Sequence, residues 1–250
     1  MAPKTNFEFD AGVFLVDKPV EITSFGVVSR LRRILQMKKV GHAGTLDPFA
    51  TGLLIVCAGR PATKLISQFM DGKKEYLATL RLGVETETQD TEGAVTGRRS
   101  VGEISSLEVE ECLQKFRGRQ MQVPPAYSAL KHKGKPLYYY ARKGIEIAKD
   151  PREVDITTLE RTDGCQTLFG EEADLGIRVV CSKGTYIRTL AADIGRSLGC
   201  GAHLVQLRRT RSGCFTVDES LTWDDLSGDD ALKRCIHKMI TVEQVCKLLQ

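Results

Sequence analysis

The first sixty residues carry an apolar pattern that predicts two strands with a helix between them. Residues 13–17 begin with four apolar side chains and are followed by a Lys-Pro pair, as expected of a short strand that a proline stops. Apolar side chains then recur at helical spacing over 27–35, behind Thr23 or Ser24 as the N-cap. Residues 53–58 are apolar throughout and too few for a helix, which indicates a buried strand.

The next apolar segments predict another strand and another helix. Residues 74–84 alternate between apolar and polar side chains, so we expect a strand with one buried face. The acidic stretch 85–93 that follows is expected to be a loop. Ser105 and Glu108 have the spacing of a capping box, and Gly118 is a plausible end for the helix that they open.

The last third of the chain mixes both kinds of element. We expect strands at 175–182 and 204–209, a helix at 184–198 and two weak amphipathic helices in the acidic tail after 218. Strand and helix signals do not alternate as regularly as they do in a doubly wound sheet. The pattern therefore predicts an α+β fold.

The composition fits a soluble globular protein and adds little to its function. The 250 residues are 42% hydrophobic and 27% charged, and the net charge of +4 is weak evidence for a nucleic-acid partner. There is no membrane-length apolar run and no secretory signal, so we expect a cytoplasmic protein without a membrane partner. The eight cysteines are scattered without a CxxC pair, which favours reduced, structural thiols and no metal site.

The segment 41–52, GHAGTLDPFATG, is the strongest local candidate for chemistry. The sequence has no phosphate-binding loop, dinucleotide-binding motif, nucleophile elbow or HExxH zinc motif. Glycines in this segment allow close approach to a ligand, and Pro48 restricts the backbone of Asp47. Taken alone, an Asp-Pro pair is more often a simple turn, and spacing does not decide between the two.

A second candidate is the segment 131–143, in which lysines and arginines surround three consecutive tyrosines. Such a mixture suits RNA, because cations hold phosphates and aromatic rings stack on bases. The alternative is an ordinary solvated helix.

Seven collinear blocks over about residues 12–215 resemble the TruB family of tRNA pseudouridine synthases, whose members modify uridine 55 in the T loop. The blocks are, in order, FLVDKP with TSF, KVGHAGTLDPFATGLL, KEY, QDTEG, PPAYSALK, SKGTYIRTLAADIG and LRRTRSG. The GTLDP block is highly specific. The resemblance implies a pseudouridine synthase fold, with a central mixed, largely antiparallel sheet, flanking helices and an RNA-gripping insertion.

The same resemblance implies three catalytic residues. Asp47 matches the essential carboxylate, Tyr76 matches the tyrosine that stacks on the target base, and Arg188 matches the arginine that pairs with the aspartate. Without the family, Tyr76 could be a core aromatic residue and Arg188 a surface residue. The expected reaction breaks a C–N glycosidic bond and forms a C–C bond to the same sugar carbon, with the target base flipped out. It needs no cofactor and no metal.

Further residues are expected to contact RNA. The resemblance places His42 at the disrupted T loop, Lys18 in a Lys-Pro pair near the active site and Leu207 in the lining of the base pocket. It also places the RNA-gripping insertion at about 122–150. The RNA contacts expected there and in the GTYIRTL block are Lys131, Lys133, Arg142 and Tyr186.

The expected organisation is a catalytic domain over 1–215 and a short helical tail over 216–250, without a complete C-terminal RNA-binding domain. The expected partner is the T stem-loop of tRNA, bound by a monomer that needs no protein partner. Two alternatives remain: a non-catalytic RNA-binding module on the same fold, and a guide-RNA-dependent relative that acts on ribosomal RNA and carries extra domains.

Overall fold

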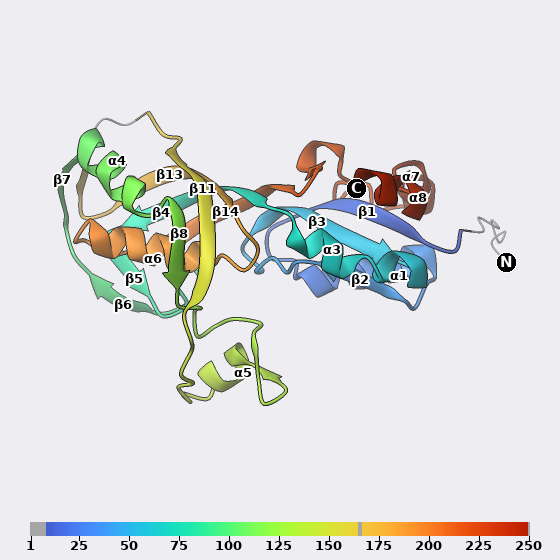
Figure 1. The fold of residues 1–250 in the computed structure, drawn as a ribbon, viewed down its shortest axis with the longest axis horizontal. Helices are drawn as coiled ribbons and strands as arrows, with labels where there is room; N and C mark the ends of the chain where they lie inside the picture. The colour runs from blue at the N-terminus through green and yellow to red at the C-terminus, as the bar shows by residue number, and fades with distance from the viewer. Residues whose placement is uncertain (1–8, 165–166, 250) are drawn as a thin grey trace. The chain divides into compact units, whose positions relative to one another are not determined.

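The computed structural model describes residues 9–164 and 167–249, and the chain forms two compact units. Unit 1 contains residues 1–72 and 209–250, and unit 2 contains residues 73–208. Strand β14 (Ala202–Ser212) runs from unit 2 into unit 1 (Figure 1).

Unit 1 is built on β3 (Thr51–Ala58), which pairs antiparallel with both β1 (Gly12–Lys18) and β2 (Val40–Ala43). The side chains of β1 alternate between two cores, as the period of a strand requires. Phe14 and Val16 pack with the buried face of helix α1 (Ser24–Leu35).

The opposite face of β1 belongs to the second core of unit 1. Val13 and Leu15 pack there with residues that follow β3 and with the end of the chain. The elements nearby are α2 (Arg60–Thr63), α3 (Ile66–Asp71), β15 (Phe215–Thr216), the 3-10 helix η1 (Val217–Glu219) and α8 (Val242–Leu248). Helix α7 (Ala231–His237) instead packs in the first core, where it contacts α1. The two helices expected in the tail are therefore present. The backbone of Ile240 pairs with that of Val13, which attaches the tail to β1.

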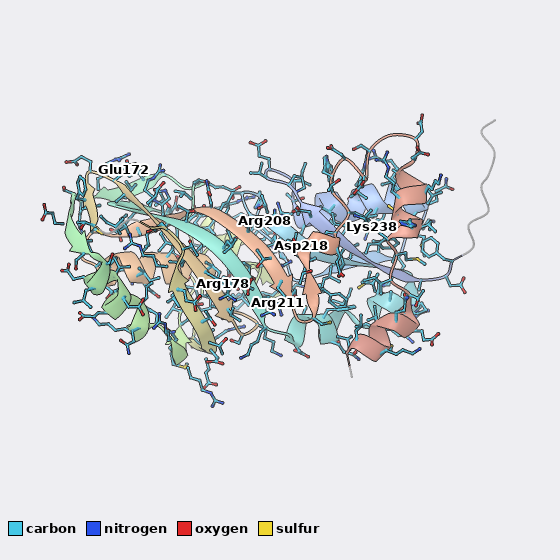
Figure 2. The ribbon with its side chains drawn as sticks, turned by 90° about the horizontal axis from the view of Figure 1, so that it is seen from above. Glu172, Arg178, Arg208, Arg211, Asp218 and Lys238 are labelled. Atoms are coloured by element: carbon cyan, nitrogen blue, oxygen red, sulfur yellow. The ribbon has the colours of Figure 1, made fainter. Side chains whose placement is uncertain are left out.

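Unit 2 contains an antiparallel series of four strands. Strand β4 (Lys74–Leu82) pairs with β13 (Ala173–Cys181), β13 with β11 (Arg152–Arg161), and β11 with β8 (Gly118–Gln122). Arg178, labelled in Figure 2, lies on β13 and bonds Glu75 on β4 at 2.8 Å and Glu160 on β11 at 3.1 Å. This ion-pair network joins three neighbouring strands.

Helices α4 (Ser106–Lys115) and α6 (Ile187–Ser197) contact each other in unit 2. Two small sheets pair β5 (Val84–Thr86) with β6 (Val95–Arg98), and β7 (Val101–Ser105) with β12 (Thr167–Gly170). The expected insertion contains β9 (Lys131–His132), β10 (Lys135–Pro136) and the short helix α5 (Leu137–Ala141).

The α+β class is confirmed, as are the capping box of Ser105 and Glu108 and the N-cap at Thr23. Several boundaries were wrong. The strand expected over 74–84 breaks at Gly83, whose φ of +89° turns the chain, and part of the expected loop becomes β5. The fourth helix ends at Lys115 rather than at Gly118, which instead begins β8. Helix α6 begins at Ile187, three residues later than its apolar pattern suggested.

Seven cysteines in the described residues are free, and five of them are buried, as reduced structural thiols would be. Burial raises the pKa of Cys57 to about 12. Cys214 and Cys246 are exposed, and Cys165 lies outside the described residues. Within the described ranges, no cluster of His, Cys, Asp and Glu side chains could hold a metal ion. The part of the chain that the structure describes also has no helix long and apolar enough to cross a membrane.

Candidate active site

Asp47 lies in an irregular segment between β2 and β3, which we call the Asp47 loop (residues 44–50). The N–H of Ala50 donates to the carbonyl oxygen of Asp47 at 3.1 Å, which closes a tight turn after the carboxylate. The proline that follows confines Asp47 to extended backbone conformations. Asp47 is partly buried.

Lys18 supports the Asp47 loop from within unit 1. Its side chain is 0% exposed, and its ammonium donates to the carbonyl oxygens of Pro19 at 2.9 Å, Ile22 at 2.6 Å and Pro48 at 3.1 Å. A buried ammonium held by three carbonyls cannot reach an RNA phosphate. The expectation that Lys18 contacts RNA is therefore replaced by a structural role beside Asp47.

Arg209 supports the beginning of the loop and the strand that follows it, a role that the sequence did not reveal. The side chain is buried, and its guanidinium donates from Nε to Leu53 O at 2.7 Å and from Nη2 to Gly44 O at 3.1 Å. Gly52 lies directly against the Arg209 backbone, where a Cβ would sit 2.2 Å from a carbonyl oxygen. The LRRTRSG block carries Arg209, but nothing in its pattern shows that this arginine points inward.

His42 lies on β2, opposite Val56 of β3, and is partly buried. Its Nδ1 is buried and makes no hydrogen bond. Burial, and then the positive charge of Arg209, lower the pKa of His42 below its ordinary value of 6.5. His42 is therefore a neutral imidazole at pH 7.

Arg188 is buried in unit 2 as the second residue of α6. Its Nη1 lies 3.1 Å from a carboxylate oxygen of Asp90 and donates to Thr88 O at 3.0 Å, and its Nη2 donates to Tyr127 O at 2.8 Å. The alternative that Arg188 is a surface residue was wrong, because the side chain is only 5% exposed.

Asp90 is a functional candidate that the sequence reasoning missed, although the QDTEG block contains it. Its side chain is 2% exposed and accepts from the hydroxyl of Thr88 and, at 3.0 Å, from the N–H of Glu92. These donors and the buried guanidinium of Arg188 satisfy the oxygens of the buried carboxylate. Asp90 and Arg188 are 98 positions apart, and only the fold brings them together.

The remaining predicted residues of unit 2 lie on three different elements. Tyr76 lies on β4 opposite Val179, and it is only partly buried rather than enclosed in the core. Tyr186 is the N-cap of α6, and its main chain is held by two hydrogen bonds to the side-chain amide of Gln122, at 2.8 and 3.1 Å. Leu207 lies on β14 and is buried.

The insertion displays its cations at the surface. Lys131, Lys133 and Arg142 are exposed. Lys135 and Lys143 lie over the ring of Tyr139, with Nζ at 4.4 and 4.5 Å from its centroid. Hydrogen bonds from the same two lysines lower the pKa of Tyr139, that from Lys143 most strongly.

A cavity of about 740 Å³ lies between the insertion and neighbouring parts of unit 2. Its lining combines apolar side chains with a few polar groups, and includes Glu87, Tyr127, Leu137, Ala141, Ile145 and Lys149. The hydroxyl of Tyr127 donates to Glu87 at 2.7 Å on this lining. Cations beside a half-apolar hollow suit a ligand that is both charged and aromatic, as a nucleic acid is.

Family models place the chain among the RNA-modifying isomerases. The model for the N-terminal domain of TruB family pseudouridylate synthase matches residues 32–187, and the model for the C-terminal domain of tRNA pseudouridylate synthase B matches residues 188–245. The chain belongs to the TruB family of pseudouridylate synthases. The domain boundary expected at residue 215 stays a prediction.

Curated relatives agree with the family. A protein of Desulfotalea psychrophila named tRNA pseudouridine synthase B is 66% identical over 243 residues, which cover 97% of this chain and 98% of the relative. A protein of Chromobacterium violaceum with the same name is 50% identical over 228 residues, which cover 91% of this chain and 72% of the relative.

Solved structures confirm the fold. A chain of a Cbf5-Nop10-Gar1 complex superposes with a TM-score of 0.69 at 29% identity, over 95% of this chain and 62% of that one. A chain of an H/ACA RNP bound to a substrate RNA containing 2'-deoxyuridine gives a TM-score of 0.64 at 26% identity, over 95% and 61%. This chain thus spans less than two thirds of either structural relative.

Proposed function

We propose that this TruB family isomerase converts uridine 55 in the T loop of tRNA into pseudouridine, with Asp47 as its catalytic carboxylate. The relatives named tRNA pseudouridine synthase B support tRNA as the substrate. The observation that supports the role of Asp47 is that two buried cations, Lys18 and Arg209, hold its loop and the strand beside it through backbone carbonyls.

The proposed reaction is an isomerisation, so every atom of the uridine is retained. The C–N bond between base and sugar breaks, and the freed uracil turns. A base carbon then bonds to the same sugar carbon and loses its proton, while the nitrogen that left the sugar gains one. A carboxylate at position 47 can attack the electron-poor sugar carbon or stabilise its positive charge while the base turns.

Arg188 and Tyr76 complete the proposed machinery. The resemblance to the family assigns Arg188 to hold Asp47 ionised, and a guanidinium suits that task because it stays charged and can bond a carboxylate through two N–H groups. Tyr76 is proposed to stack on the target base after it leaves the RNA stack, which offsets part of the cost of unstacking.

RNA is proposed to lie along the insertion, with phosphates near the exposed cations Lys131, Lys133 and Arg142. His42, Tyr186 and Leu207 are proposed to contact the loop that contains the target. The neutral state of His42 favours this role, because a neutral imidazole can stack on bases or share hydrogen bonds with them. We further propose that the protein acts as a monomer in the cytoplasm, without a protein partner.

The test is to treat an unmodified tRNA transcript with the purified chain alone and to map pseudouridine along it. We expect modification at position 55 without added guide RNA or protein. Binding without modification would favour the non-catalytic RNA-binding module, and modification that requires a guide RNA would favour the guide-dependent relative.

The matched variant is Asp47→Asn, which keeps the side-chain shape and removes the charge. Turnover should disappear, while affinity for tRNA stays within about tenfold of wild type, or about 1.4 kcal/mol. Asp229→Asn, at an exposed position of unit 1, is the control for a general loss of negative charge and should leave turnover unchanged. Appreciable pseudouridine formation by the Asp47 variant would refute the assignment.

A further inference from the structure

One buried hydroxyl connects the beginning of α1 to the residue before Asp47. Ser24 is the first residue of the helix and is 3% exposed. Its Oγ donates to the carbonyl oxygen of Leu46 at 3.0 Å and accepts from the N–H of Leu46 at 2.9 Å. Leu46 is also buried, at 3% exposed, so water has little access to these two backbone groups.

These hydrogen bonds fix the peptide plane that leads into Asp47. The carbonyl of Leu46 belongs to the same rigid amide plane as the N–H of Asp47, so holding that oxygen orients the plane. The plane after Asp47 is held as well, because the Asp47 carbonyl accepts from the N–H of Ala50 at 3.1 Å. With both flanking planes held and Pro48 restricting the backbone, the direction in which the main chain presents the Asp47 side chain is closely defined.

Ser24 is the part of this arrangement that no other group replaces. Lys18 bonds the loop after Asp47, at Pro48 O, and Arg209 bonds it at Gly44 O. Both hydrogen-bonding capacities of the Ser24 hydroxyl are directed at a single residue, Leu46, next to the carboxylate. The helix does not need the Ser24 hydroxyl for capping, since Thr23 already caps α1 by accepting from Gly26 N–H at 2.9 Å.

We propose that Ser24 is a positioning residue for Asp47, which sets the direction of the catalytic carboxylate through the backbone of Leu46. The inference rests on the proposed function of Asp47. Without the Ser24 hydroxyl, the amide plane before Asp47 gains freedom and the carboxylate samples orientations that do not face the sugar carbon. A displacement of about 1 Å can lower the rate of a positioned reaction by about a hundredfold.

The adjacent residue supplies a matched control. Ser24→Ala and Thr23→Ala each remove one hydroxyl at the beginning of the same helix, and each should lower the urea midpoint of unfolding. Of these two hydroxyls, only that of Ser24 bonds the Asp47 loop in the described structure. A role limited to helix stability predicts the same kinetic behaviour for both variants, whereas a positioning role separates them.

The experiment measures single-turnover pseudouridine formation on a tRNA transcript, together with tRNA affinity, at a temperature where each variant is folded by circular dichroism. We expect Ser24→Ala to lower the single-turnover rate by about tenfold to a hundredfold with affinity within about twofold. Thr23→Ala should keep both near wild type. A Ser24→Ala rate within about twofold of wild type, or an equal loss in Thr23→Ala, would overturn the proposal.

Ser24→Cys covers the case in which the alanine variant does not fold. The thiol fills the same space but is a weak donor and acceptor, so we expect a folded protein with a reduced rate. A wild-type rate in the cysteine variant would also overturn the proposal. Asp47→Asn is measured in parallel, because activity in that variant would refute the proposed function itself. An inactive Asp47→Asn variant together with a normal Ser24→Ala variant would refute only the positioning role.

Discussion

Asp90→Asn is the substitution for which the structure makes the sharpest prediction about stability. It replaces a buried carboxylate with an amide of the same shape, opposite the guanidinium of Arg188 at 3.1 Å. The two side chains are 2% and 6% exposed, so water can replace little of the lost negative charge. The variant therefore leaves a buried positive charge without this counter-charge.

The expected magnitude follows from this burial. Removing one partner of a buried ion pair destabilises a protein by about 3–5 kcal/mol, because the remaining charge stays desolvated. The hydrogen bonds of Arg188 to Thr88 O and Tyr127 O remain, and they place the expected loss toward the lower end of that range. Loss of the negative charge should also lower pseudouridine formation, since Arg188 belongs to the proposed machinery.

The assay is urea unfolding followed by circular dichroism, with Asp174→Asn as the control. Asp174 pairs with Arg81 in unit 2 at 2.9 Å, but the two side chains are 48% and 38% exposed. An exposed pair contributes about 0.2–1 kcal/mol, so the control should lose at most about 1 kcal/mol. The double variant Asp90→Asn with Arg188→Met removes both charges. Its loss in free energy of unfolding should be smaller than the sum of the losses in the two single variants, since no unpaired charge is left behind.

Equal losses in the two Asp→Asn variants would contradict this reasoning. Such a result would mean that the Arg188 charge is compensated by its other partners and not by Asp90. Simple additivity of the two charge removals would support the same conclusion.

Two further predictions concern RNA binding and pH. Neutralising the insertion cations should weaken tRNA binding. It should also lower the slope of log affinity against log salt concentration by up to about 0.9 for each lost phosphate contact, as measured by titration at several salt concentrations. The residues to change are Lys131, Lys133, Lys135, Arg142 and Lys143. An unchanged slope would mean that these cations do not contact RNA phosphates and that the insertion is an ordinary solvated surface. The pKa of His42 in the folded protein lies below 6.5, so the unfolded chain binds the proton more readily. The free energy of unfolding should therefore fall as pH drops below about 6.5, by at most about 1.4 kcal/mol per pH unit. His42→Gln should remove this part of the slope in melts between pH 5.5 and 7.5, and identical slopes would show that His42 titrates normally.

The sequence was most informative where local physics decides the structure. The apolar run of β1, the helical spacing of α1 and the capping box of α4 each depend on neighbouring residues, and each was predicted. The polar strands β8 and β11 were not predicted, because their side chains are mostly not apolar and their stability comes from pairing with each other and with β13.

The candidate site shows the same difference between features set by neighbouring residues and features set by distant ones. Asp47 could be found because its loop has an unusual sequence that resembles a known family. Asp90 could not be assigned, because its partner Arg188 lies 98 positions away and neither side chain has a local pattern that indicates burial. Lys18 was assigned to RNA from its resemblance to a family Lys-Pro pair, and only the fold shows three carbonyls around its ammonium.

Three of the buried cations, Lys18, Arg188 and Arg209, have a common explanation in the hydrogen-bonding needs of irregular backbone. A strand or helix satisfies its own carbonyls, but the carbonyls of a buried loop need donors from elsewhere. Lys18 and Arg209 lie on strands of unit 1 and Arg188 on a helix of unit 2, and each reaches carbonyls of neighbouring irregular segments. A long cationic side chain can reach such carbonyls, and the carbonyl dipoles offset part of the cost of burying its charge. This arrangement holds the backbone near Asp47 in place through its carbonyls.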